Sequence, residues 1–202
     1  VYGDVDSHLN ALDESFHCYN IVNCTNGYIF RPSAFNAWGD GIYIGTEYTG
    51  LTNKQLKNVT IFEPFVRHCG RNCIAITSGI DLNVYSPDVS DAFRTAPMSG
   101  IDIEPEGIGA CKPVLVNVNI HGSTLVSDCI RGLAVVIYPA TEGVVSVTCG
   151  DVRAKACQVP FQAINWAYNY GEVTIGDIHV NGSTTTPVSL KWSSLNIHLS
   201  IG

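Results

Sequence analysis

The sequence predicts an all-β fold, a β-solenoid with coils of roughly 20–30 residues. Short β-branched runs recur along the chain with apolar residues at alternate positions, which is the pattern of a half-buried strand. The segments between them carry no sustained helical periodicity, and turn residues are abundant, with 19 glycines and 9 prolines. Charged residues make up only 14% of the chain, against about 25% in typical globular domains, which argues against a helical bundle.

Two series of strands alternate along the chain. In the first series the apolar–polar–apolar runs lie at residues 59–61, 80–82, 118–120, 145–147, 173–175 and 197–199. The second series lies at residues 42–44, 74–76, 101–103, 133–135 and, less regularly, 161–163 and 188–190. Parallel strands stacked coil on coil would place the alternate apolar residues in ladders inside the solenoid. A β-sandwich would instead need tight turns between paired strands, but Asn26-Gly27 and Asn181-Gly182 recur at one phase inside the units.

Four of the eight cysteines follow the same repeat. Cys69, Cys129 and Cys157 each stand four or five residues before a strand of the second series, and Cys24 precedes residues 28–30 in the same way. Free cysteine is among the most buried residue types, so we interpret the series as a core ladder of reduced thiols rather than a redox or metal site. The chain contains no pair of CxxC motifs, which argues against structural zinc.

Composition also narrows the possible functions. The chain has 11 basic and 18 acidic residues and a net charge of −7, so no nucleic-acid partner is expected. The longest apolar stretch, residues 133–138, is far shorter than the roughly 18 residues of a membrane span, so no membrane insertion is expected. Because the chain begins with Val1 and ends within an expected strand, we expect residues 1–202 to be a single domain from a longer protein.

Four stretches of the chain come in an order typical of one family. They are residues 39–45 (GDGIYIG), 58–61 (NVTI), 71–78 (RNCIAITS) and 99–105 (SGIDIEP). Together they resemble the pectin-lyase-like superfamily, most closely its phage tailspike and polysaccharide-depolymerase branch. The resemblance implies a single-stranded right-handed parallel β-helix, a homotrimer at the virion tail or another extracellular location, and a polysaccharide ligand. It does not imply catalysis, because many members only bind or support.

A carboxylate pair lies on one strand of the second series. Because Ile101 and Ile103 point into the core, Asp102 and Glu104 are expected on the outer face, about 6.5–7 Å apart along the strand. Stacking of the strands at about 4.8 Å would form one outward column of Tyr43, Ala75, Asp102 and Ala134, and an adjacent column of Thr77, Glu104 and Val136. The small side chains leave room for a ligand, and Tyr43 offers a ring face to a pyranose.

Paired carboxyl groups are what glycoside hydrolysis needs, one to protonate the leaving oxygen and one to activate water or attack carbon. We therefore predict that Asp102 and Glu104 hydrolyse a bacterial surface or extracellular polysaccharide without a cofactor, supported by Asp40 and Glu47. The expected substrate-binding residues are Tyr43, Arg71, Thr77, Glu106 and Arg131. The spacing of the pair straddles the ranges for retaining and inverting enzymes, so the stereochemistry stays open.

Two other functions remain open. A polysaccharide lyase would need a basic residue and cations. The candidates for the basic residue are Arg67, His68, Arg71, Arg94 and Arg131, and Asp102 and Glu104 could hold a calcium ion. A non-catalytic β-helix for adhesion or glycan binding would leave the acidic face solvated. The three-aspartate site of the polygalacturonases, which share the superfamily, cannot be transferred, because this sequence has no Asp-Asp pair.

Overall fold

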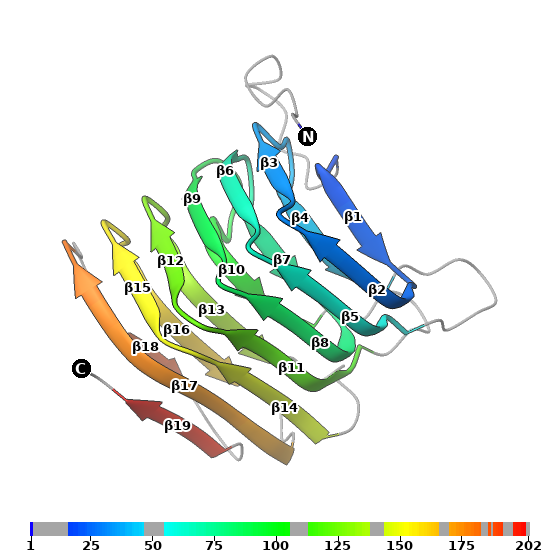
Figure 1. Cartoon of the computed structure of the whole chain (residues 1–202). Helices are drawn as coiled ribbons and strands as arrows, with labels where there is room; N and C mark the ends of the chain where they lie inside the picture. The colour runs from blue at the N-terminus through cyan, green and yellow to red at the C-terminus, as the bar shows by residue number, and fades with distance from the viewer. Residues whose placement is uncertain are drawn as a thin grey trace.

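A computed structural model describes residues 1, 16–46, 55–105, 113–137, 144–165, 170–182, 186, 188–191 and 196–200. This part of the chain forms strands and no helix, which confirms the all-β prediction. None of its residues belong to a helix that could cross a membrane. The strands lie side by side in parallel from β1 at one end of the stack to β19 at the other (Figure 1).

The strands repeat along the chain in the order first, second and third sheet. The first sheet contains β1 (Tyr19–Val22), β4 (Ile42–Gly45), β7 (Ile74–Ile76), β10 (Ser99–Ile103), β13 (Arg131–Ile137), β16 (Val159–Asn165) and β18 (Val188–Lys191). The second contains β2 (Thr25–Phe30), β5 (Lys57–Phe62), β8 (Gly79–Tyr85), β11 (Leu115–His121), β14 (Val144–Cys149), β17 (Tyr170–Asn181) and β19 (Asn196–Ser200). The third contains β3 (Ser33–Phe35), β6 (Phe65–Cys69), β9 (Asp88–Ala92), β12 (Thr124–Ser127) and β15 (Val152–Lys155).

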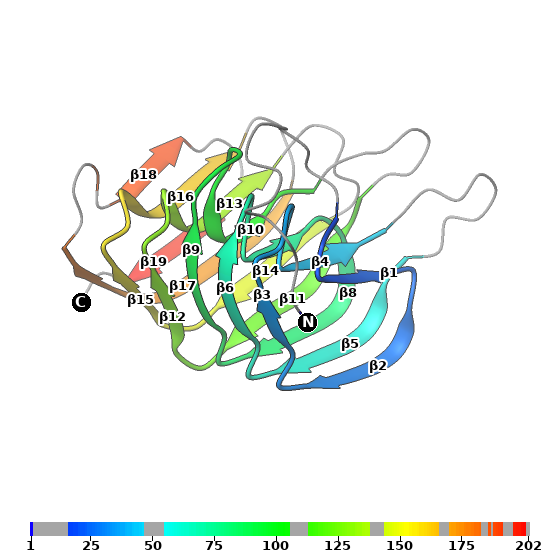
Figure 2. The same cartoon turned by 90° about the horizontal axis from the view of Figure 1, so that it is seen from above.

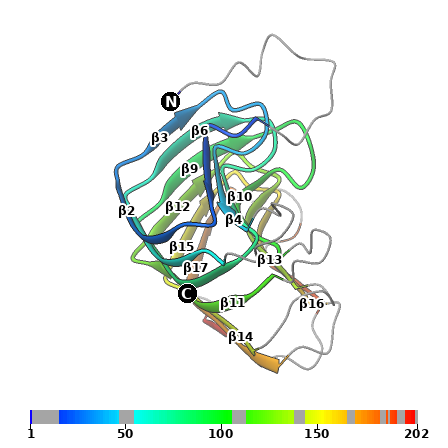
Figure 3. The same ribbon diagram turned by 90° about the vertical axis from the view of Figure 1, so that its right-hand side faces the viewer.

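The long strand β17 belongs to two of these sheets. Its first part pairs with β14 in the second sheet, and its last part, from Ile178 to Asn181, pairs with β15 in the third. In the views of Figures 2 and 3 the three sheets wrap around one interior, and the third sheet runs as a row from β3 through β6, β9 and β12 to β15. The pairing is therefore that of a parallel β-solenoid.

Both predicted strand series are confirmed, and each forms one sheet. The runs at 59–61, 80–82, 118–120, 145–147, 173–175 and 197–199 lie in strands of the second sheet. The runs at 42–44, 74–76, 101–103, 133–135, 161–163 and 188–190 lie in strands of the first. The third sheet was not predicted, because its strands are only three to five residues long and each gives the core one or two apolar residues. Its inward column is Ala34, Val66, Val89, Val126 and Ala154.

Aliphatic columns fix the register of the first sheet. One column is Ile42, Ile74, Ile101, Leu133 and Phe161, and the next is Ile44, Ile76, Ile103, Val135 and Ala163. All these side chains are buried. Burying one isoleucine contributes about 1.5–3 kcal/mol, and a slip by one residue would turn a whole column to the outside. The side chains between them are thereby fixed on the outer face.

Residues in the left-handed αL conformation bend the chain near the corners of each coil. They stack in three columns: Asn26, Asn58, Asp81 and Asn117; Arg31, Glu63, Ser86 and Gly122; and Asn36, His68, Asp91, Asp128, Ala156 and Gly182. Their φ angles lie between 47° and 75°. Asn, Asp and Gly adopt this conformation most readily, whereas Arg, Glu and Ala adopt it here because the parallel ladders on both sides fix the backbone.

The predicted thiol ladder is confirmed at the corner between the third and first sheets. Cys69, Cys129 and Cys157 are buried and free there. Ala92, which pairs with Cys69, takes the place of a cysteine in one coil. The buried Cys73 packs beside this column and donates a hydrogen bond from its Sγ to the Ser90 carbonyl (3.2 Å). Cys24 is only half-buried and lies before β2, away from this corner.

Candidate functional site

The outer face of the first sheet carries the column that the sequence predicts. Tyr43 pairs with Ala75, Ala75 with Asp102, and Asp102 with Ala134. The column continues to Gln162 on β16. The alternation of side chains along β10 therefore predicts correctly that Asp102 lies on the face opposite Ile101 and Ile103.

Asp102 is not solvated, although it faces away from the aliphatic core. Its side chain is buried, with 1% of its surface exposed, whereas Glu104 is half-buried. Asn72 Nδ2 donates a hydrogen bond to Asp102 Oδ2 (3.3 Å). No N–H or O–H group of the described residues donates to the buried Oδ1. A buried carboxylate oxygen without a hydrogen-bond partner is unfavourable, so burial favours the neutral, protonated form of Asp102.

Glu104 contributes to the electrostatic environment of Asp102. Burial, followed by the charge of Glu104 and a hydrogen bond with it, raises the pKa of Asp102 well above its usual value. The charge of Arg71 opposes the shift. The raised pKa favours a protonated Asp102 beside Glu104.

Asp40 lies beside this pair in the turn before β4 and is completely buried. Arg71 Nη1 donates to its Oδ2 (3.2 Å), and the Asn72 backbone N–H donates to its Oδ1 (2.9 Å). Burial raises the pKa of Asp40 to about 6, while Arg71 and the hydrogen bonds act against the shift. The glycine after it is required, because a Cβ on Gly41 would meet the side chain of Val66.

Asn72 connects the carboxyl groups of neighbouring coils. Its backbone binds Asp40, its Nδ2 binds Asp102, and its Oδ1 accepts a hydrogen bond from the Ser99 backbone N–H (2.9 Å). Sequence reasoning missed this residue, although it stands within the 71–78 stretch that carries the family resemblance. No signal in the sequence marked Asn72, because its contacts with Asp102 and Ser99 follow from the three-dimensional register of the coils.

His17 is a second residue of the site that the sequence did not indicate. Its Nδ1 accepts a hydrogen bond from the Asp40 backbone N–H (3.0 Å), so the ring proton sits on Nε2. Burial and the nearby charge of Arg71 lower the pKa of His17 to about 4, which keeps the ring neutral near pH 7. The contact of His17 Nδ1 with Asp40 Oδ2 (3.4 Å) is therefore not an ion pair at neutral pH. A lone histidine in the first coil carries no sequence signal for this role.

Tyr43 and Thr77 lie next to each other as predicted, but one face of Tyr43 is covered. Thr77 Oγ1 donates to Tyr43 Oη (3.0 Å), and His17 stacks on the Tyr43 ring with centroids 4.8 Å apart. Only the other ring face or the edge remains for a ligand. Gly45 makes this packing possible, because a Cβ there would clash with Thr77 Oγ1.

The predicted Arg131 does not join this group. Arg131 begins β13 and pairs with Ser99, a position equivalent to Asn72 and not to Arg71, so the two arginines do not align. Glu47 and Glu106 lie outside the described residues. Among the residues that are described, no group of three His, Cys, Asp or Glu side chains is arranged to hold a metal ion.

The hydrogen bond between Asp102 and Glu104 limits what the pair can do. Carboxyl groups that flank a glycosidic bond stand about 5–5.5 Å apart in retaining enzymes and about 6.5–9.5 Å apart in inverting ones. Asp102 and Glu104 instead interact directly with each other, through the charge and the hydrogen bond that raise the pKa of Asp102. The pair is therefore arranged to hold and deliver one proton, with Arg71 and Asp40 setting the local charge.

No protein-family model, curated protein or solved structure matches the chain. The functional argument therefore rests on the fold and on the geometry of the first sheet.

Proposed function

We propose that the protein binds a bacterial surface or extracellular polysaccharide on the outer face of the first sheet and hydrolyses it. The observation that carries the proposal is the buried, proton-holding Asp102 hydrogen-bonded to the half-buried Glu104. Perturbed carboxyl groups of this kind cluster at catalytic sites. Tyr43 lies half-buried on the same outer face and can contact the sugar chain, and the buried Thr77 hydrogen-bonds to it.

In the proposed reaction the pair acts as one acid and then as one base. Glu104, which is half-buried, passes the proton of Asp102 to the glycosidic oxygen as the bond from that oxygen to the anomeric carbon breaks. A water oxygen bonds to the anomeric carbon, and its proton returns to the Glu104–Asp102 pair. The pair ends as it began, with the proton again on Asp102. Glu47 and Glu106 are candidates for a further carboxylate.

We also propose that the solenoid is a right-handed, tailspike-like parallel β-helix that works outside the cell or on a virion. Parallel crossover connections are right-handed in about 98% of cases, which supports the handedness. The first coils expose Phe16, Tyr28 and Phe30, with 73%, 64% and 70% of their surfaces free. Exposed rings on one part of a surface favour a contact with another chain, which supports the homotrimer.

A non-catalytic glycan-binding module is the second candidate. The burial of Asp102 and its hydrogen bond with Glu104 favour it, because the two carboxyl groups do not flank a space for a glycosidic bond. Elimination is less well supported, even with calcium as a cofactor. The ion pair with Asp40 keeps Arg71 protonated, and a protonated guanidinium cannot abstract a proton.

The products of a digestion separate these functions. The whole chain is incubated with a panel of purified bacterial capsular and extracellular polysaccharides, and new reducing ends and the ultraviolet absorbance of unsaturated uronates are followed. Hydrolysis gives reducing ends alone, and this is the expected result. Unsaturated ends would show elimination, and retention on an immobilised polysaccharide without any product would show the binding module.

A further inference from the structure

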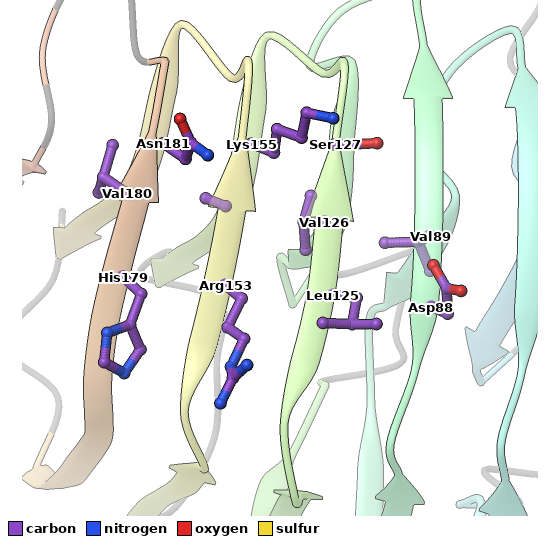
Figure 4. Close-up of a pocket in the computed structure, with 11 residues that line it drawn as sticks. Asp88, Val89, Leu125, Val126, Ser127, Arg153, Lys155, His179, Val180 and Asn181 are labelled. Atoms are coloured by element: carbon purple, nitrogen blue, oxygen red, sulfur yellow. The ribbon is translucent and has the colours of Figure 1, made fainter.

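A groove of about 540 Å³ lies on the outer face of the third sheet, away from the site on the first sheet (Figure 4). Its side chains come from β9, β12, β15 and the end of β17. The register places Asp88, Leu125, Arg153 and His179 in one row across the strands. Ser127, Lys155 and Asn181 form a second row.

The groove is positively charged in a chain of net charge −7. Arg153, Lys155 and His179 are exposed, and no hydrogen bond or ion pair holds their side chains within the described part of the chain. The carboxylate of the groove, Asp88, is already neutralised, because Arg67 Nη2 donates to Asp88 Oδ1 (2.6 Å). Arg67 is fixed in that position by a second bond to the Asp88 carbonyl (2.8 Å). The charged side chains of Arg153 and Lys155, at the other end of the groove, can therefore bind a ligand.

The backbone of the groove argues against a peptide as that ligand. An extended peptide is usually bound by adding a strand to a free sheet edge. Here β12 lies between β9 and β15, and β15 lies between β12 and β17, so their main-chain groups are paired on both sides. The groove can therefore contact a ligand only through side chains. These are the charged groups of Arg153 and Lys155, the Ser127 hydroxyl, the Asn181 amide and the apolar surface of Leu125, which is 43% exposed.

We propose that this groove binds an acidic oligosaccharide, lying across the strands with its carboxylates on Arg153 and Lys155. Outward side chains repeat at about 4.8 Å from coil to coil, which suits a polymer with a repeating unit. Sugar hydroxyls would bond to Ser127 and Asn181, and the apolar face of a ring would cover Leu125. The choice of a saccharide rests on the proposed function, but binding here does not require cleavage on the first sheet.

Calorimetric titration of the whole chain with tetragalacturonate tests the proposal. Maltotetraose is the neutral probe of equal length, and tetraglutamate is the acidic peptide probe. We expect tetragalacturonate to bind more tightly than both. The double variant R153A/K155A should bind it at least about tenfold more weakly, because hydrogen bonds to charged groups contribute more than neutral ones. The matched control is Lys57→Ala, which removes an exposed cation from the second sheet.

Three results would overturn the proposal: equal binding of maltotetraose, equal binding of tetraglutamate, or unchanged binding by R153A/K155A. Circular dichroism of both variants checks that they are folded, and all three substituted side chains are exposed. Loss of cleavage in the Glu104→Gln variant with unchanged tetragalacturonate binding would separate the two sites. Binding without cleavage of any polysaccharide would remove the proposed hydrolysis and leave the groove intact.

Discussion

Arg71 and Asp40 form a buried ion pair between neighbouring coils, with Nη1 and Oδ2 3.2 Å apart and only 7% and 0% of the side chains exposed. The Arg71→Met variant should lose about 3–5 kcal/mol of unfolding free energy at neutral pH, because Asp40 would stay buried without a counter-charge. Urea unfolding measures the loss. It should shrink at acidic pH, where Asp40 takes up a proton.

Arg153→Met is the control for that variant, because Arg153 is exposed. Its unfolding free energy should change by no more than about 0.5 kcal/mol. A similar small change in Arg71→Met would show that the ion pair does not stabilise the coils.

Gly45 allows Tyr43 and Thr77 to meet on the outer face. Gly45→Ala should destabilise the protein by about 1–3 kcal/mol, because the new Cβ would clash with Thr77 Oγ1 and the β-branched Thr77 is buried. Adding Thr77→Ala should recover part of the loss in a double-mutant cycle. At Gly27 an added Cβ would make only ordinary contacts with Val59, so Gly27→Ala is the control. Equal losses at the two glycines would contradict the clash.

His17 and Asp40 should make opposite contributions to the pH dependence of stability. Folding lowers the pKa of His17 from 6.5 to about 4, so its contribution is present above about pH 6.5 and is lost as the pH falls toward 4. Folding raises the pKa of Asp40 from 3.8 to about 6, so its contribution is present below about pH 4 and is lost as the pH rises through 6. Each effect amounts to about 3 kcal/mol at most.

Unfolding of two variants at about pH 4 and pH 7 separates these contributions. The advantage of wild type over His17→Gln should grow as the pH rises, since the glutamine oxygen can still accept the Asp40 N–H but cannot take up a proton. The advantage of wild type over Asp40→Asn should shrink over the same interval. Parallel pH curves for wild type and both variants would contradict the two pKa shifts.

The buried thiols should resist chemical modification in the folded protein. Burial raises the pKa of Cys149 to about 12 and that of Cys157 to about 11, so little thiolate forms near pH 8. Mass spectrometry after treatment with iodoacetamide should find both unmodified in the native protein and modified in urea. Modification of either in the native protein, or a disulfide at either position, would contradict the burial and the free state of these two thiols.

Two of the three sheets could be predicted from the sequence, and so could the outward column of Tyr43, Ala75, Asp102 and Ala134 on the first sheet. The Ile101 and Ile103 positions fix which side of β10 faces the core, and stacking of equal coils then aligns Asp102 with Ala75 and Ala134. The third sheet escaped prediction because a strand such as β9, with Val89 flanked by Asp88 and Ser90, shows no apolar alternation.

The environment of Asp102 could not be read from the same pattern. Alternation assigns a residue to a face but does not say what covers that face. Asn72 and His17 reach the site from turns and from another coil, and their positions follow only from the three-dimensional register. The hydrogen bond between Asp102 and Glu104 likewise depends on side-chain conformations that strand spacing does not determine.

The rate of polysaccharide hydrolysis by Glu104→Gln tests the central claim most directly. The glutamine keeps the size of the side chain but cannot carry the proton. Reducing-end release from the polysaccharide that wild type cleaves is compared with that of Glu172→Gln, which neutralises an exposed carboxylate on the second sheet. The account predicts a loss of at least about 100-fold in Glu104→Gln and an unchanged rate in Glu172→Gln. A folded Glu104→Gln variant that hydrolyses at the wild-type rate would contradict it.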